Sequence, residues 1–137
     1  MLELALVTLV QGNAGVSAIA SVGGFSIQLP KGQALPSWSY HVAAEKLDYT
    51  LEGRAGVGFR RIQFDCYGNV AADCISLAAA IHSVLNGYSG TVLTATSPIT
   101  TLAVIQGCFL LNTIDFFDEP SRTYRRMLEY EVWFNQN

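Results

Sequence analysis

The segment 60–86 changes its hydrophobic period part-way along, and this change constrains the fold more than any other feature. Ile62, Phe64 and Cys66 alternate with polar residues, which is the pattern of a strand with one face toward water. After residue 69, apolar residues return every three or four positions, which is the pattern of a helix with one apolar face. We therefore predict a strand followed by a helix that folds back onto a sheet. The apolar positions of this helix are Val70, Cys74, Leu77, Ala78, Ile81 and Leu85.

Both ends of this helix are marked in the sequence. Asn69 is the expected N-cap, because its side-chain oxygen can accept a hydrogen bond from a free amide of the first turn. Gly87 is expected to end the helix, because glycine adopts the left-handed conformation without steric cost.

Other segments give shorter signals. A helix is expected at 2–10, and Asn13 is expected to cap a further helical turn. Alternating residues predict a strand at 38–51 with a bulge at 43–46, where the apolar parity changes. Clustered strands indicate an α+β fold: an antiparallel-rich sheet with one long and one short helix packed on one side and a C-terminal β-hairpin. Further strands are expected at 25–29, at 91–96 and at 102–111 with a candidate bulge at Gly107, and the hairpin pairs 109–117 with 124–134.

The expected hairpin carries acidic residues before its turn and basic residues after it. Opposite charges on paired strands typically stabilise by ~0.2–1 kcal/mol per pair. We therefore expect ion pairs across this turn. The acidic residues are Asp115, Asp118 and Glu119, and the basic residues are Arg122, Arg125 and Arg126.

Charged residues are few and unevenly placed. Only 14% of the 137 residues are charged, against roughly 25% in an average soluble domain. No Asp, Glu, Lys or Arg lies between Glu3 and Lys31 or between Asp73 and Asp115. The chain, 1–137, is expected to be one domain that hides part of its surface against a neighbour, and an apolar core with neutral loops is the alternative.

Composition also argues against several partners. The net charge of -3 and the lack of a Lys/Arg run argue against direct, sequence-specific binding of nucleic acid. No run of about 18 consecutive apolar residues predicts a membrane span. The N-terminus lacks the positive flank and the cleavage site of a signal peptide. An odd number of cysteines, three, suits a reducing cytoplasm better than a disulfide framework.

Residues that could support catalysis or metal binding form no recognised arrangement. Cys66 and Cys74 fall on predicted apolar faces, where cysteine behaves as a small inert hydrophobe. The cysteine and histidine spacings are not those of a zinc site, and Gly53-x-x-Gly56-x-Gly58 lacks the spacing of a phosphate loop. We therefore expect a protein that is not an enzyme and that needs no cofactor or metal.

Several short motifs occur in an order that resembles one family of phage proteins. They are Leu29–Pro36 followed by Tyr40, the strand Arg61–Tyr67, the helix end Leu85–Gly90, and the final strand Tyr124–Phe134 with Tyr-x-Val-Trp-Phe. In this order and spacing they resemble the tail-completion, or tail-terminator, family of long-tailed phages, which has relatives in prophages and gene transfer agents. The resemblance covers most of the chain, but the segment after the long helix has no distinctive match.

The resemblance implies a non-enzymatic virion protein that forms a ring, a hexamer, at the head-proximal end of the tail. Such a ring would cap the tail tube, stop its polymerisation and join the tube to the head. The implied partners are further copies of the chain, the tail-tube protein and the head–tail connector or adaptor protein. Assembly would take place in the cytoplasm of the host bacterium.

Candidate contact surfaces are the sheet edges and the loops 31–36 and 89–101, which are partly apolar and bounded by turn residues. Arginines at an interface can pair with acidic neighbours and set the register, although an ion pair within the chain is the simpler interpretation of each. The candidate interface residues are Lys31, Gln33, Leu35, Arg60, Arg61, Thr94, Thr96, Ile99, Arg122, Arg125 and Arg126.

Two other interpretations stay open. A tail-tube or connector-adaptor subunit belongs to the same assembly, but a tube protein should polymerise whereas a terminator should stop at one ring. A small-ligand-binding α+β module belongs to a different class. It should have a large apolar pocket between sheet and helix, with a few convergent polar groups.

Overall fold

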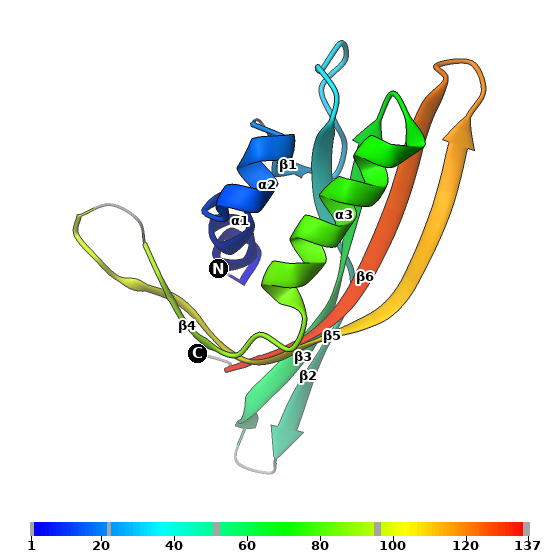
Figure 1. Ribbon diagram of the computed structural model, residues 1–137. Coiled ribbons are helices and arrows are strands. Elements are labelled where there is room, and N and C mark those ends of the chain that lie inside the picture. The colour runs from blue at the N-terminus through cyan, green and yellow to red at the C-terminus, as the bar shows by residue number, and fades with distance from the viewer. Residues whose placement is uncertain (1, 22, 51–52, 95–96, 136–137) are drawn as a thin grey trace.

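The computed structural model describes residues 2–21, 23–50, 53–94 and 97–135, and it confirms the α+β fold. A six-stranded sheet has the order β1-β2-β3-β6-β5-β4, and Figure 1 shows the helices together on one of its faces. No helix in the described ranges is long and apolar enough to cross a membrane. The elements are α1 (Leu2–Gln11), α2 (Ala14–Ile19), β1 (Phe25–Ser26), β2 (Ser37–Thr50), β3 (Gly53–Gly68), α3 (Ala71–Leu85), β4 (Gly90–Leu93), β5 (Thr101–Asp118) and β6 (Thr123–Asn135).

The central strand and the long helix occupy their predicted positions. On β3, Ile62, Phe64 and Cys66 are fully buried, which confirms the apolar side of the alternation, whereas Asp65 on the face predicted to be toward water is buried as well. Helix α3 packs its apolar face against β3 and β6. Gly87 follows the helix with a φ of 69°, the left-handed conformation that was expected there. The buried residues of α3 are Cys74, Leu77, Ala78, Ile81 and Leu85.

The start of α3 differs from the prediction. Val70 is the N-cap in place of Asn69, and it makes no side-chain capping hydrogen bond. The backbone of Val70 is extended, so the helix begins one residue later and Asn69 lies outside the first turn. Val70 is exposed and does not join the buried face. The approach to the helix is tight, because a Cβ at Gly68 would lie 2.9 Å from the Cβ of Asp73.

The N-terminal residues form two short helices, as the sequence indicated. Helix α1 buries Leu2, Leu6 and Val10 in the core. Asn13 caps α2 as predicted, because its side-chain oxygen accepts a hydrogen bond of 3.2 Å from the Val16 amide. The cap therefore turns the chain directly from one helix into the next.

Strand β1 is shorter than the predicted strand 25–29. Only Phe25–Ser26 pairs with the sheet, in parallel with β2. Ile27 then leaves the sheet with a φ of 71°, which is a strained conformation for a β-branched residue. Its amide donates a hydrogen bond of 2.7 Å to the Tyr40 carbonyl. The apolar alternation at 25–29 was therefore misleading, because the backbone turns away after two residues.

Strand β2 has the predicted irregularity. Its register with β3 shifts between Val42 and Ala44, within the segment where the apolar parity changes. Before the bulge, Trp38 is buried in the core, where its ring centre lies 6.0 Å from that of Phe64. The bulge therefore separates a core-facing half of β2 from the half that extends beyond the core.

Strands β5 and β6 form the predicted C-terminal hairpin, but 102–111 and 109–117 belong to one continuous strand. The register of β5 with β6 shifts between Ile105 and Gly107, which confirms a bulge at this glycine. The buried residues on the core side of β6 are Leu128, Tyr130, Val132 and Phe134.

Strand β4 is shorter than the predicted strand 91–96. It covers Gly90–Leu93, and residues 95–96 lie outside the described residues. Its partners on β5 are Thr101–Ile105. Within the described chain, β5 beyond Ile105 therefore has β6 as its only neighbouring strand.

Candidate assembly interface

The two adjacent arginines of β3 are already paired within the chain. Arg60 makes ion pairs with Glu3 of α1, at 2.7 Å, and with Glu45 of β2. Arg61 points to the opposite face of the sheet, where it pairs with the buried carboxylate of Glu129. Both arginines link elements of one subunit, so in this structure they stabilise the fold of the subunit itself.

Arg126 forms the ion pair across the hairpin that the sequence predicted. Its Nε donates to Oδ1 of Asp115 at 2.7 Å, and its Nη2 donates to Oδ2 at 2.9 Å. These hydrogen bonds lower the pKa of Asp115 and raise the pKa of Arg126. Arg122 pairs with Glu119 at 3.7 Å inside the turn, where both side chains are largely exposed.

We expect the Asp115–Arg126 pair to make a small, pH-dependent contribution to stability. A carboxyl group whose pKa is lowered on folding stabilises the fold above its ordinary pKa of 3.8, and this contribution is lost as the pH falls through the lowered value. Because the Asp115 side chain is 61% exposed, the contribution should stay below ~1 kcal/mol. In urea unfolding, wild type and Asp115→Asn should differ in stability at about pH 6 and converge near about pH 2. An equal difference at both pH values would contradict the ion pair.

Arg125 does not pair with an acidic residue of the hairpin, contrary to the prediction. The strand registers place it beside Tyr67 and Phe116, on the sheet face opposite the helices. Its guanidinium carbon lies 4.3 Å from the centre of the Phe116 ring. Oδ1 of the buried Asp65 lies 3.8 Å from its Nε, which is beyond hydrogen-bonding distance. Among the described residues, this Nε has no hydrogen-bond partner.

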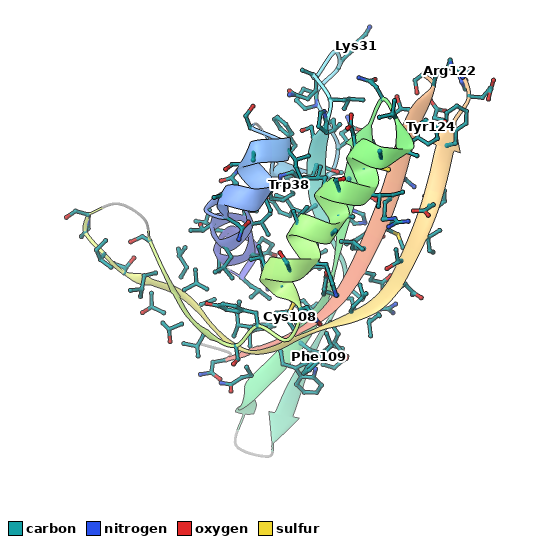
Figure 2. The ribbon with its side chains drawn as sticks, viewed as in Figure 1. Lys31, Trp38, Cys108, Phe109, Arg122 and Tyr124 are labelled. Carbon is teal, nitrogen blue, oxygen red and sulfur yellow. The ribbon has the colours of Figure 1, made fainter. Side chains whose placement is uncertain are left out.

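A groove lies at one end of the sheet, between the loop that follows β1 and the β5–β6 turn. Its volume is about 560 Å³. It brings together Gln33, Leu35 and Arg125, three candidates that are far apart in the sequence. Figure 2 shows Lys31 and Arg122 at the same end of the molecule, on the loop and on the turn. The remaining apolar lining includes Leu29, Pro30, Tyr67, Phe116 and Phe117.

The loop between β4 and β5 contains three further candidates. The Thr94 hydroxyl accepts a hydrogen bond of 2.9 Å from the Thr100 amide and donates one of 3.2 Å to the Pro98 carbonyl, so Thr94 closes the loop. Ile99 is exposed in this loop, and Thr96 lies outside the described residues. In Figure 1 the β4–β5 arm extends away from the β5–β6 turn. The structure therefore does not bring these candidates together with those of the groove.

The outer edge of β5 from Phe109 onward is a surface that the predicted residues missed. Before it, Cys108 is buried and its carbonyl accepts a hydrogen bond of 2.9 Å from the Gly87 amide. Helix α3 packs on β3 and β6, so it leaves β5 from Phe109 onward uncovered. Every residue from Phe109 to Asp118 is exposed. The available signal was the nearly continuous apolar run without alternation, because such a strand is normally buried on both faces. Its large apolar side chains, each 38–51% exposed, are Phe109, Leu110, Leu111, Ile114, Phe116 and Phe117.

The three cysteines are buried in the core. Cys66 and Cys74 lie on the apolar faces where the sequence placed them. Burial raises the pKa of all three thiols, that of Cys108 to about 12, and therefore favours the unreactive protonated form. In the described part of the chain, no group of three or more His, Cys, Asp or Glu residues is placed to hold a metal ion.

Comparison with known proteins gives a similarity to solved structures. No family model and no curated protein matches the sequence. Among solved structures, a similar chain comes from a structure described as the virion of a native gene transfer agent particle. The TM-score is 0.69, and the match covers 98% of this chain and 95% of the other. This similarity establishes the fold.

The sequence identity to that chain is 14%. At this level most surface residues differ, and a shared fold does not by itself transfer a function. The role of this chain must therefore be argued from its own surfaces.

Proposed function

We propose that this chain is a structural virion protein, a tail-terminator subunit that forms a hexameric ring at the head-proximal end of a phage-like tail. The ring caps the tail tube, stops its polymerisation and joins it to the head–tail connector or adaptor protein. Subunits assemble in the cytoplasm of the host bacterium. The order of the sequence motifs and the fold shared with a chain of a gene transfer agent particle support this proposal.

The observation that carries the proposal is the free apolar edge of β5. A strand edge presents unpaired N–H and C=O groups to other strands, and monomeric proteins usually protect it with charged residues or proline. Between Phe109 and Phe117 the only charged residue is Asp115. The exposed apolar residues along this edge amount to roughly 500 Å², comparable with the largest apolar patch of a typical monomer. Such an edge is expected to be covered in the assembled protein.

The opposite edge of the sheet supplies a matching surface. Among the residues that the structure describes, β1 pairs with β2 at Ser39 and Tyr40, and the Gly24 amide donates one further hydrogen bond to the Trp38 carbonyl. The central strands alternate in direction, because β2 pairs antiparallel with β3, β3 with β6, and β6 with β5. Strands β2 and β5 therefore run in opposite directions. When neighbouring copies are related by rotation about an axis along the strands, β5 of one copy meets β2 of the next as an antiparallel partner.

This contact is head to tail, because two different surfaces of the subunit meet. Repeating such a contact gives a ring when the rotation closes and an open filament when it does not. A standard stable interface buries ~800 Å² on each partner. The exposed apolar residues of β5 supply more than half of that area, in addition to the backbone hydrogen bonds of a new strand pair.

The solution mass tests the proposal. Light scattering across a wide concentration range, with negative-stain images of the same samples, should show a discrete ring of about six copies and about 90 kDa, given a subunit of 14.9 kDa. Open-ended tubes would indicate a tail-tube subunit instead. A monomer that also fails to form rings on added tail tubes would contradict the proposed ring.

The interpretation as a small-ligand-binding module receives less support from the structure. It requires a large apolar pocket between sheet and helix. Core side chains fill most of that space, among them Phe64, Leu77, Ile81 and Tyr130, and a pocket of about 320 Å³ lies between the start of α3 and the β5–β6 hairpin. The larger groove of about 560 Å³ lies at the end of the sheet.

A further inference from the structure

The groove at the end of the sheet contains the Arg125 guanidinium, whose orientation is fixed but which is only loosely paired within its own chain. The Arg125 guanidinium rests on the face of the Phe116 ring, which fixes its orientation. Asp65 lies on its Nε side at 3.8 Å, too far to accept a hydrogen bond. A guanidinium has five N–H donors, and the Arg125 side chain is 34% exposed where it lines the groove. Its terminal nitrogens are therefore open to a ligand in the groove.

The neighbouring Arg126, in contrast to Arg125, is fully paired with a carboxylate of its own chain. It lies on the other face of the hairpin, where two hydrogen bonds from its guanidinium satisfy both carboxylate oxygens of Asp115. Of the two adjacent arginines, Arg126 thus has a hydrogen-bonded carboxylate, Asp115, within the chain. Arg125 has the aromatic platform but lacks a hydrogen-bonded carboxylate.

Arg125 makes one loose ion pair, with the buried Asp65 carboxylate at 3.8 Å; the other described charges around the groove are engaged elsewhere or are positive. Asp118 accepts hydrogen bonds from the amide and the hydroxyl of Ser121, so its carboxylate is committed to the turn. Arg122 and Glu119 pair with each other. Lys31, on the same loop as the lining residues Pro30 and Gly32, has no ion-pair partner among the residues that the structure describes, so it adds a positive charge at this end of the molecule.

The walls of the groove are apolar beside this cation. Leu29, Pro30 and Leu35 line the loop side, and Phe117 lines the hairpin side. A ligand that fits both features carries a carboxylate next to a large apolar group. The carboxylate can form a paired hydrogen bond with the guanidinium, the geometry that arginine favours, while the apolar group displaces water from the walls.

We infer that this groove binds an extended peptide segment of another protein, in which an acidic side chain adjoins a large apolar one. The acidic side chain pairs with Arg125, and the apolar side chain packs between Leu29 and Phe117. That this other protein belongs to the virion rests on the proposed function. The groove shares Phe116 and Phe117 with the end of the β5 edge, so the peptide and a neighbouring copy would meet there. The rest of its lining, on the loop 29–35 and at Tyr67 and Arg125, lies outside that edge and stays available in a ring.

Nucleic acid fits the groove less well than an acidic peptide. A phosphate backbone needs several cations in a row to replace its counterions. Here Asp118 lines the groove and Asp65 lies behind Arg125, so a polyanion meets negative charge on two sides. A peptide with a single carboxylate meets much less of this repulsion than a polyanion does.

Amide NMR spectra of the ¹⁵N-labelled protein test the inference. The probes are terminally blocked hexapeptides in which one glutamate is flanked by each combination of leucine, isoleucine and phenylalanine. Several members should shift the amide resonances of residues 29–35 and 116–125. Replacing the glutamate by glutamine should weaken binding by about tenfold or more, because a charge-assisted hydrogen bond is lost.

Variants of single residues distinguish binding in the groove from a nonspecific effect of removing a positive charge. Arg125→Met should abolish the preference for glutamate over glutamine, whereas Arg126→Met removes an adjacent cation on the other face and should leave that preference unchanged. Arg125→Met also removes the cation beside the buried Asp65 and could therefore affect folding. Leu29→Asp is a second variant, which disrupts the apolar wall of the groove and leaves the Arg125–Asp65 ion pair in place. It should reduce binding at least tenfold.

Several outcomes would overturn the inference. They are no shift with any peptide, shifts confined to β5 beyond the groove, tighter binding of a DNA oligonucleotide at the groove, or groove shifts caused by self-association of the protein alone. The test is independent of ring formation when it is repeated on an assembly-defective variant. Peptide binding without a ring would contradict only the proposed function, and a ring without peptide binding would contradict only this inference.

Discussion

Replacing Ile114 by lysine should leave a folded monomer under conditions where the wild-type protein forms a ring. Ile114 is 44% exposed on the part of β5 that β4 does not cover. A lysine on this edge would have to lose its hydration when a second strand is added, which is how natural edge strands resist pairing. An unpaired charge at an interface typically costs ~3–5 kcal/mol. The dissociation constant of the contact should therefore rise at least about 100-fold, as measured by light scattering.

Leu4→Lys is the matched control for this change. Leu4 is a large apolar residue that is 45% exposed, but it lies on α1 and not on the sheet edge. This variant should still assemble, and circular dichroism should show both variants folded. If Ile114→Lys assembles as well as Leu4→Lys does, pairing through the β5 edge is wrong.

Phe64→Ala should lower the free energy of unfolding by about 3–5 kcal/mol. Phe64 is fully buried at the centre of β3, and its ring lies 6.0 Å from Trp38 and 5.9 Å, edge to face, from Tyr130. Truncation removes apolar contacts and leaves a cavity between rings that cannot easily collapse. Since a typical domain has only ~5–15 kcal/mol of stability, this loss is a large share of the total.

Phe109→Ala is the corresponding exposed change, and it should alter the stability of the subunit by less than about 1 kcal/mol. Both variants should be compared by urea unfolding at one low protein concentration, because assembly itself stabilises the folded state. Similar losses for both variants would mean that Phe64 does not occupy a tightly packed core.

The elements that the sequence predicted well are those with a long, regular hydrophobic period. The alternation at 62–66 and the three- and four-residue spacing of α3 are repeated over enough positions to survive tertiary packing. The predicted strand 25–29 failed because a single backbone angle, the positive φ of Ile27, is invisible in an apolar pattern. The N-cap prediction at Asn69 failed by one residue, a common error at a helix boundary.

The candidate site was harder to predict because it depends on register and on long-range proximity. Each register shift moves a side chain to the other sheet face, and β5 has shifts near Gly107 and before Asn112. Counting alternate residues along the hairpin sequence therefore could not predict that Arg125 lies beside Tyr67 and Phe116. It also could not predict which of the two adjacent arginines faces Asp115. Gln33, Leu35 and Arg125 were each chosen from local composition. Only the fold shows that they line one groove.

The helices lie on one face of the sheet and leave the β5 and β2 edges free, and this determines how further copies could be added to an assembly. Helix α3 packs on β3 and β6, and in the proposed ring each copy would dock through two strands in the plane of the sheet, β5 and β2. In an open row of copies, one strand of each kind is always vacant and can recruit another subunit. In the proposed closed ring of six, where each copy would turn by about 60°, no vacant docking strand would remain. Lateral growth then stops by geometry alone, without a separate signal, and any further attachment must use surfaces above or below the ring.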